Sequence, residues 1–295
     1  MGREFRSHWM ECFSLATKEN GKSQRRVDGD NLLYRLLTDL ITQGGPHGQW
    51  LINHIVADCS VWWDPQVYAG CPILLPWAVR DPKCRGNKEK GISDEWGAPN
   101  IDGYFRDDNS LVKSLVRSLK VRGPRAGYMT NSKLGKGWVA AHIWRVNEGE
   151  SLASRDPRLY TFVPNLVWLP RQIAKLSDIE GGPVQAALKS ISFSLYRNAP
   201  IAGNRRAIAE QSWKYLPEPE SVSAIEKDGL SFFTSPEVTV ETRIKRTNEV
   251  ISALEAVAEG EIAPGKAIST RYSKGISLLG TRTRQNLVWE LKRHI

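Results

Sequence analysis

The stretches "WVAAHIWR" (138–145) and "NLVWLPRQIAKLSD" (165–178) decide the fold of this chain. The first is apolar and rich in residues that favour β-strands, and so is the beginning of the second. The segment between them is polar and loop-like, whereas "RQIAKLSD" has a helical composition. The sequence therefore predicts a strand over 136–146, a loop, a strand within 159–170 and a helix from Arg171.

Further helices are expected on both sides of this unit. The Trp-, Pro- and Gly-rich segment from Gly45 to Gly103 predicts short strands and long loops instead. Periodic apolar residues, capping residues and helix-ending glycines predict helices at 28–45, 107–121, 181–200, 238–260 and 282–294. The expected fold class is α+β, with the central unit between a mixed N-terminal region and a mainly helical C-terminal region.

Charge narrows the range of partners. The chain has 295 residues, and its 41 Lys and Arg against 32 Asp and Glu give a net charge of +9, which favours a polyanionic partner such as nucleic acid. Eleven tryptophans lie among the basic clusters, and Trp and Arg on one surface can stack on bases and bind phosphates. A basic surface in contact only with solvent, and tryptophans buried in the core, are the alternatives.

The expected location is the cytoplasm. No apolar run approaches the roughly 18 residues of a membrane-spanning helix, and the first residues, "MGREFRSHWMECFS", are too charged for a secretory signal. The four cysteines lie in the first third of the chain without close pairs, which favours reduced thiols over disulfides.

A strand, loop, strand and helix with "AHIW" on the first strand and "NLVWLP" on the second resemble the HNH, or ββα-metal, endonucleases. The resemblance covers residues 134 to 182. It implies that His142 is the general base that activates the attacking water. It also implies that Asn165 holds the hairpin and orients that base, and that the helix supplies a remaining group.

The chemistry of these residue types agrees with the resemblance. Hydrolysis of a phosphodiester needs a base for the water, and a histidine with a pKa near 6.5 suits that task. A divalent ion, Mg²⁺ or Mn²⁺, would stabilise the charge on the phosphate and the leaving oxygen. Asparagine has both a donor and an acceptor and can fix backbone and imidazole together. Arg145, Arg171 and Lys175 are the expected phosphate contacts near the reacting centre.

The metal ligand is left open by the sequence. Ala141 stands where the family often has a metal-binding acid, and the usual helical ligand position falls near Ala174. Asp178, about one turn further on, is the best substitute. Weaker candidates are Ser177, Glu180 and, in the loop, Asp156.

The sequence contains residues of two other kinds of site. A zinc site would use His54, Cys59, Cys71 and Cys84, but the cysteines are separated by eleven and twelve residues and form no C-x-x-C pair, which favours buried free thiols. The other large nuclease class has a PD followed by E-x-K. Here Asp102, Asp107 and Asp108 precede only the "ELK" at 290–292, on an expected helix.

The expected function is that of a metal-dependent DNA endonuclease, a sequence-specific type II or modification-dependent restriction enzyme. Residues 1–125 would recognise DNA, residues 126–200 would form the catalytic unit, and residues 201–295 would contact DNA or mediate dimerisation. A homodimer on double-stranded DNA would cut both strands. The alternative is a DNA-binding protein without catalysis. The DNA contacts expected in the C-terminal region are Arg205, Arg206, Arg243, Lys245, Arg282 and Arg284.

Overall fold

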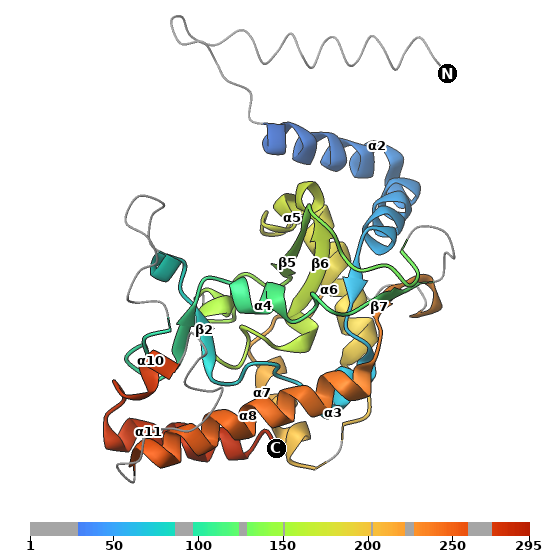
Figure 1. Cartoon of the computed structure of the whole chain (residues 1–295). Coiled ribbons are helices and arrows are strands. Elements are labelled where there is room, and N and C mark those ends of the chain that lie inside the picture. Colours follow the sequence, from blue (N-terminus) through green and yellow to red (C-terminus); the bar gives the residue numbers. More distant parts are fainter. Residues whose placement is uncertain are drawn as a thin grey trace, which may run out of the picture.

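The computed structural model describes residues 29–85, 97–123, 129–149, 151–201, 203–221, 227–258 and 273–295. Within these ranges the protein is a mixed α+β structure with a five-stranded sheet, a two-stranded sheet and nine α-helices, so the predicted class is confirmed at this level. Figure 1 shows the larger sheet near the middle, with α2 above it and α8 and α11 below. No helix in the described part is long and apolar enough to span a bilayer.

The larger sheet has the strand order β4-β7-β1-β6-β5. Its strands are β1 (Val61–Trp62), β4 (Val121–Arg122), β5 (Trp138–His142), β6 (Leu166–Pro170) and β7 (Ser231–Phe233). β5 pairs antiparallel with β6 along its whole length, and His142 lies opposite Leu166. β1 lies at the centre, antiparallel to β6 and parallel to β7. Strands from the segments 1–125, 126–200 and 201–295 therefore meet in one sheet.

The smaller sheet consists of β2 (Ala78–Arg80) and β3 (Phe105–Asp107), which run parallel with Arg80 beside Asp107. The nine α-helices are α2 (Gly29–Asp58), α3 (Pro65–Gly70), α4 (Ser110–Ser114), α5 (Arg171–Ser177), α6 (Pro183–Tyr196), α7 (Asn204–Trp213), α8 (Pro236–Ala258), α10 (Ser273–Ile276) and α11 (Thr281–Lys292). Short 3₁₀ turns are η1 (Pro82–Arg85), η2 (Ala153–Arg155), η3 (Val163–Asn165) and η4 (Lys227–Gly229).

Most of the predicted elements are present, with three differences. α2 bends at Gly45, where the glycine has a φ of 52°, and continues after Pro46 to Asp58 instead of ending at the glycines. The helix predicted over 107–121 is confined to α4, because the chain turns after Ser114 to enter β4. The second predicted strand is shorter than its apolar run, since Leu159 to Asn165 form turns before β6.

Aromatic residues build the core of the sheet. The ring of Trp63 meets Trp168 of β6 edge-on at 5.5 Å and Phe233 of β7 at 5.0 Å, and Trp168 meets Phe233 at 5.1 Å. The Trp63–Trp168 and Trp168–Phe233 pairs are edge-to-face, and such pairs add to the free energy gained by burial. Six of the nine described tryptophans are buried, which leaves Trp50, Trp138 and Trp289 at least partly exposed. Most of the described tryptophans are therefore core residues.

A close approach between α3 and α8 generates the first prediction. A Cβ at Gly70 would lie 2.7 Å from Cγ2 of Val240, so Gly70→Ala should lower the free energy of unfolding by about 1–3 kcal/mol. Urea denaturation measures this change. Gly135→Ala, where the Cβ meets nothing within 4 Å, is the control and should not destabilise. Adding Val240→Ala to Gly70→Ala should recover part of the lost unfolding free energy. Equal urea midpoints for Gly70→Ala and Gly135→Ala would contradict the prediction.

Candidate active site

His142 ends β5 and is buried, with 8% of its surface exposed. Its Nε2 lies 2.9 Å from the backbone oxygen of Tyr160, and the two rings stack at 5.6 Å. A carbonyl oxygen can only accept, so Nε2 carries the proton and Nδ1 of the neutral ring has a free lone pair. Nδ1 has no hydrogen-bond partner among the described residues. The ring is thus fixed in the tautomer that can accept a proton.

The environment keeps this ring neutral. Burial, with a further contribution from the positive charge of Arg80, lowers the pKa of His142 from 6.5 to about 4. The hydrogen bond to the Tyr160 carbonyl opposes this change but does not offset it. At pH 7 the side chain is therefore an unprotonated base.

Asn165 holds the loop that carries Tyr160. Its side chain is fully buried: Oδ1 accepts from the Trp144 backbone at 2.8 Å and Nδ2 donates to the Leu159 carbonyl at 3.0 Å. Its backbone carbonyl also accepts from Ile143. One residue thus ties both ends of the loop 143–165, and it fixes the peptide next to the carbonyl that orients His142.

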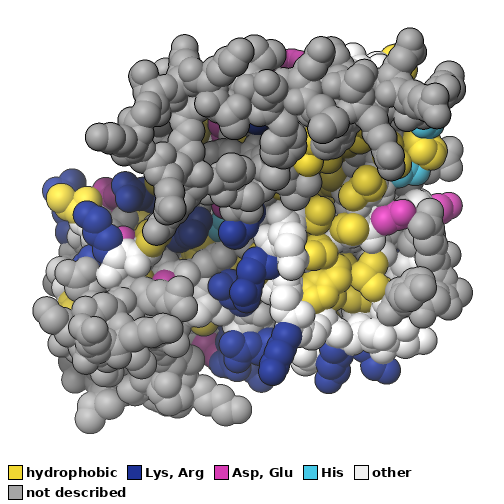
Figure 2. All heavy atoms as spheres, turned by 90° about the horizontal axis from the view of Figure 1, so that it is seen from above, with side chains coloured by type: hydrophobic (Ala, Val, Ile, Leu, Met, Phe, Trp, Pro, Cys, Tyr) yellow, Lys and Arg dark blue, Asp and Glu magenta, His cyan; other side chains and the backbone are white. Residues whose placement is uncertain are grey.

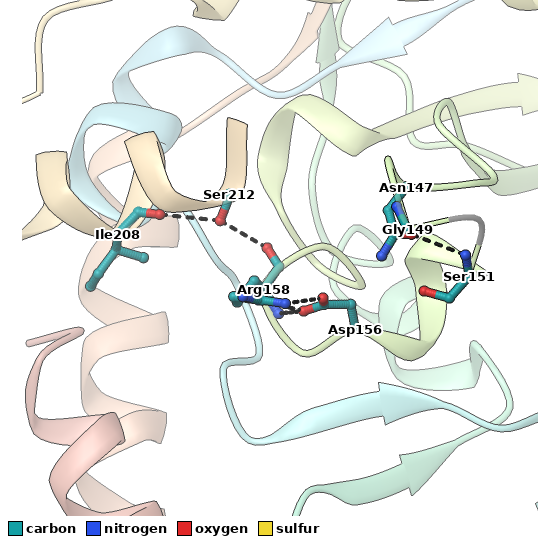
Figure 3. A network of polar contacts seen from close by, with 7 residues as sticks. All are labelled: Asn147, Gly149, Ser151, Asp156, Arg158, Ile208 and Ser212. Atoms are coloured by element: carbon teal, nitrogen blue, oxygen red, sulfur yellow. Dashed lines mark hydrogen bonds and ion pairs between the residues drawn. The ribbon is translucent and has the colours of Figure 1, made fainter. Parts of the chain in front are cut away.

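The same loop is braced along its length, as Figure 3 shows. Asn147 accepts backbone hydrogen bonds from Gly149 and Ser151 through Oδ1, both at 3.0 Å. The carboxylate of Asp156 binds the guanidinium of Arg158, whose backbone oxygen lies 3.0 Å from Oγ of Ser212 on α7. Asp156, a weak metal candidate from the sequence, is therefore an ion-pair partner that shapes the loop.

Two polar residues from outside the hairpin, Asp107 and Asn109, bond to it, and the charge of a third, Arg80, acts on His142. None of the three was assigned to this site from the sequence. Asp107, fully buried at the end of β3, accepts from the hydroxyl of Tyr160 at 2.7 Å. Arg80 is its neighbour on β2, and Asn109 donates from Nδ2 to the carbonyl of Ala140 at 3.3 Å. A parallel pairing of short strands brings them together. The only sequence signal was the group of aspartates at 102–108.

Two atoms of this group are buried without a partner among the described residues: Nε of Arg80 and Oδ1 of Asn109. Buried polar atoms are nearly always paired, so each unpaired one calls for an explanation. One is a charged donor, which suits a phosphate oxygen, and the other is an acceptor, which suits a water or a cation. With Nδ1 of His142, three polar atoms of these residues thus have no partner in the described part of the chain: a base, a cationic donor and a polar acceptor.

The predicted metal ligand, Asp178, lies in a different setting. It follows α5 with its side chain 70% exposed, and Oδ1 lies 3.9 Å from Nε of Arg145. Arg145 also donates to the backbone oxygen of Asp178. In the described ranges, no group of three or more His, Cys, Asp or Glu side chains is placed to share a metal ion. A single carboxylate beside a guanidinium does not by itself fit a divalent ion.

The other metal candidates have partners of their own. Glu180 binds Lys189 at 2.9 Å and Gln185 at 3.0 Å, and Ser177 donates to the carbonyl of Ala174 at 2.8 Å. Burial raises the pKa of the Cys71 and Cys84 thiols to about 12, so both are protonated at neutral pH without a metal ion.

The residues of the PD…E-x-K alternative do not form one group. On α11, Glu290 pairs with Arg293 at 3.1 Å and Lys292 pairs with Glu255 of α8 at 2.8 Å. Asp107 is instead held in the polar group beside His142. Asp102 lies in an exposed turn, and Asp108 accepts from the Ser110 backbone at 3.1 Å.

The predicted DNA-contacting side chains lie in two places. Near the hairpin, Arg171 and Lys175 are exposed on α5, one turn apart. Arg145, which follows β5, is partly buried and pairs with Asp178. The six contacts predicted in the C-terminal region are on α7, α8 and α11. Of these, Arg206, Lys245 and Arg282 are exposed and Arg205 and Arg243 are partly buried. Arg284 is only 8% exposed, and its Nε has no partner among the described residues.

The low pKa of His142 makes protein stability depend on pH. The folded protein favours the neutral ring, so this contribution is complete above pH 6.5 and is lost as the pH falls towards 4. Between pH 7 and pH 4, wild type should lose roughly 3 kcal/mol more unfolding free energy than His142→Gln, whose amide can still donate to Tyr160. Urea denaturation at both pH values measures the difference. Parallel losses in the two proteins would contradict it.

Comparisons with known proteins identify no relative. No protein-family model matches the chain, and no match was found among curated proteins or among solved structures.

Proposed function

We propose that this protein is a DNA endonuclease in which His142 is the general base. The observation that carries the proposal is the fixed tautomer of His142 at the end of a hairpin: Nε2 donates to the Tyr160 carbonyl and leaves Nδ1 unprotonated. A base held in one orientation and beside a cationic side chain supports the hydrolysis of a phosphodiester. Its pKa of about 4 makes it a weaker base than a histidine that titrates near 6.5, so its fixed position is what recommends it.

The proposed chemistry uses these side chains in sequence. Nδ1 of His142 takes a proton from a water molecule, and the resulting hydroxide attacks the phosphorus. The bond from phosphorus to the leaving sugar oxygen breaks, that oxygen takes a proton from solvent water, and His142 returns its own proton to solvent. The guanidinium of Arg80 binds a phosphate oxygen and stabilises the negative charge that grows there. Asn165, Tyr160 and Asp107 are positioning residues, because they hold the loop and the ring stacked on His142 rather than the substrate.

Metal dependence is a separate part of the proposal. It rests on the resemblance to the HNH endonucleases, and Asp178 remains the sequence-based candidate for a ligand. A divalent ion would supply Lewis-acid stabilisation of the phosphate and the leaving oxygen. The same resemblance supports a sequence-specific or modification-dependent restriction enzyme that acts as a homodimer on double-stranded DNA, in the cytoplasm.

A DNA-binding protein without catalysis is the second candidate. The observation that favours it is the burial of His142, since a histidine that is 8% exposed and bonded to a carbonyl also satisfies a purely structural role. The two candidates differ in whether DNA is cut.

Plasmid cleavage tests the choice between them. Purified wild type with Mg²⁺ or Mn²⁺ should convert supercoiled plasmid into nicked or linear DNA, and His142→Gln should lower the rate by at least about 100-fold while it still binds DNA in a gel shift. A thermal melt at pH 7 verifies that the variant folds. Intact plasmid with wild type under every metal condition, with the gel shift retained, would favour the second candidate.

The pH profile gives an independent check on the base. Because the pKa of His142 is about 4, the ring is unprotonated above about pH 5. Above that pH, the titration of His142 should no longer change the cleavage rate. The acid limb of the rate is expected near pH 4. An acid limb near 6.5 that disappears in His142→Gln would contradict the environment described for this residue.

Asp178→Ala tests the metal ligand. If Asp178 binds the ion, the variant should need a higher Mg²⁺ or Mn²⁺ concentration for half-maximal cleavage, by about tenfold or more. Glu148→Ala is the control, because Glu148 is also an exposed acid but is not a ligand candidate. The same metal requirement in Asp178→Ala, Glu148→Ala and wild type would remove Asp178 from the site.

A further inference from the structure

The segment from Asn109 to Asn147 has an extreme charge balance. It contains eight Lys and Arg and not one Asp or Glu, although the whole chain has 32 acidic residues. Six of these basic residues are exposed in the described part of the segment: Lys113, Arg117, Lys120, Arg122, Lys133 and Lys136. All of them except Arg122, which pairs with Asp64, are called the basic face below. They were not among the DNA contacts predicted from the sequence.

The fold brings two of these charges together. Lys120 lies directly opposite Lys133 in an antiparallel bridge, which is closed by a hydrogen bond from Val121 to Ser132 at 2.9 Å. Like charges that face each other across paired strands repel and lower stability. The two lysines therefore repel each other, and a bound anion would relieve this repulsion.

The basic face also lacks compensation by acids. None of its five residues has an ion-pair partner among the described residues. Other arginines nearby do: Arg122 pairs with Asp64, and Arg145 pairs with Asp178. The face therefore presents its full positive charge to an external partner. Figure 2 shows groups of Lys and Arg side chains on the upper side of the molecule, next to an apolar area.

Two connections link the segment that carries the basic face to the strand that ends in His142. Asn109 precedes α4 and donates to the carbonyl of Ala140, two residues from His142 on β5. Lys136 lies two residues before β5 and is at most about 20 Å from His142, at about 3.3 Å per residue. Phosphates follow one another every 3.4 Å or so along a DNA strand, so this distance corresponds to about six phosphates.

We propose that the basic face binds the phosphate backbone of duplex DNA on one side of the bond that His142 hydrolyses. This inference rests on the proposed function for its substrate. It adds the surface that positions the duplex. It also gives the path of the duplex over that surface, from β5 towards the bridge between Lys120 and Lys133. Contacts of this kind give affinity without sequence preference.

The salt dependence of binding tests the inference. Fluorescence anisotropy with a labelled duplex, in EDTA to prevent cleavage, gives the slope of log K against log salt concentration. Lys120→Gln/Lys133→Gln should make that slope shallower by about 2, because each lost phosphate contact removes about 0.9. The control Lys83→Gln/Lys214→Gln removes two exposed lysines outside the face and should leave the slope unchanged.

The outcomes separate this inference from the nuclease proposal. A shallower slope in the first variant alone supports the basic face, even if wild type cuts no plasmid. Equal slopes in wild type and both variants would overturn the basic face while leaving cleavage by His142 intact. Tighter binding of duplex RNA than of duplex DNA by wild type, or the same loss of slope in both double variants, would also overturn it.

Discussion

The buried side-chain amide of Asn165 is the interaction on which the geometry around His142 depends. It forms hydrogen bonds with the Trp144 backbone amide and with the Leu159 carbonyl, two groups that lie at opposite ends of one loop. Without it, two buried backbone groups would lose their partners, at about 1–3 kcal/mol each. The loop would also be free to move the Tyr160 carbonyl, and with it the tautomer and orientation of the imidazole.

A second layer of support comes from residues far away in the sequence. Asp107 holds the Tyr160 hydroxyl, and Arg80 lies beside Asp107 because β2 and β3 pair in parallel. The hairpin and the two-stranded sheet therefore meet at the stacked rings of His142 and Tyr160. The hairpin supplies the base, and the two-stranded sheet supplies the positive charge of Arg80 and the acceptor Asp107. The low pKa of His142 follows from the same packing, since burial excludes water and Arg80 adds positive charge.

The sequence predicts the local part of this arrangement well. Apolar β-prone runs and a helical composition were enough for β5, β6 and α5, because each depends on residues next to one another in the chain. Arg80 and Asn109 could not be placed in the same way. Their positions depend on pairing between strands only two or three residues long, which carry too little pattern to be read. The continuation of α2 past Pro46 was missed because a glycine and a proline usually end a helix, whereas here they bend it.

Because β1 lies at the centre of the sheet, the hairpin and the rest of the protein depend on each other for folding. β1 is two residues long and buried, and it lies between a strand of the hairpin and a strand from the last third of the chain. A hairpin transplanted into another protein would leave behind the strand that covers its inner edge, and β1 would lose its antiparallel partner. Site and surroundings are therefore expected to fold and unfold together, so natural variation should accumulate in the connecting loops rather than through exchange of whole segments.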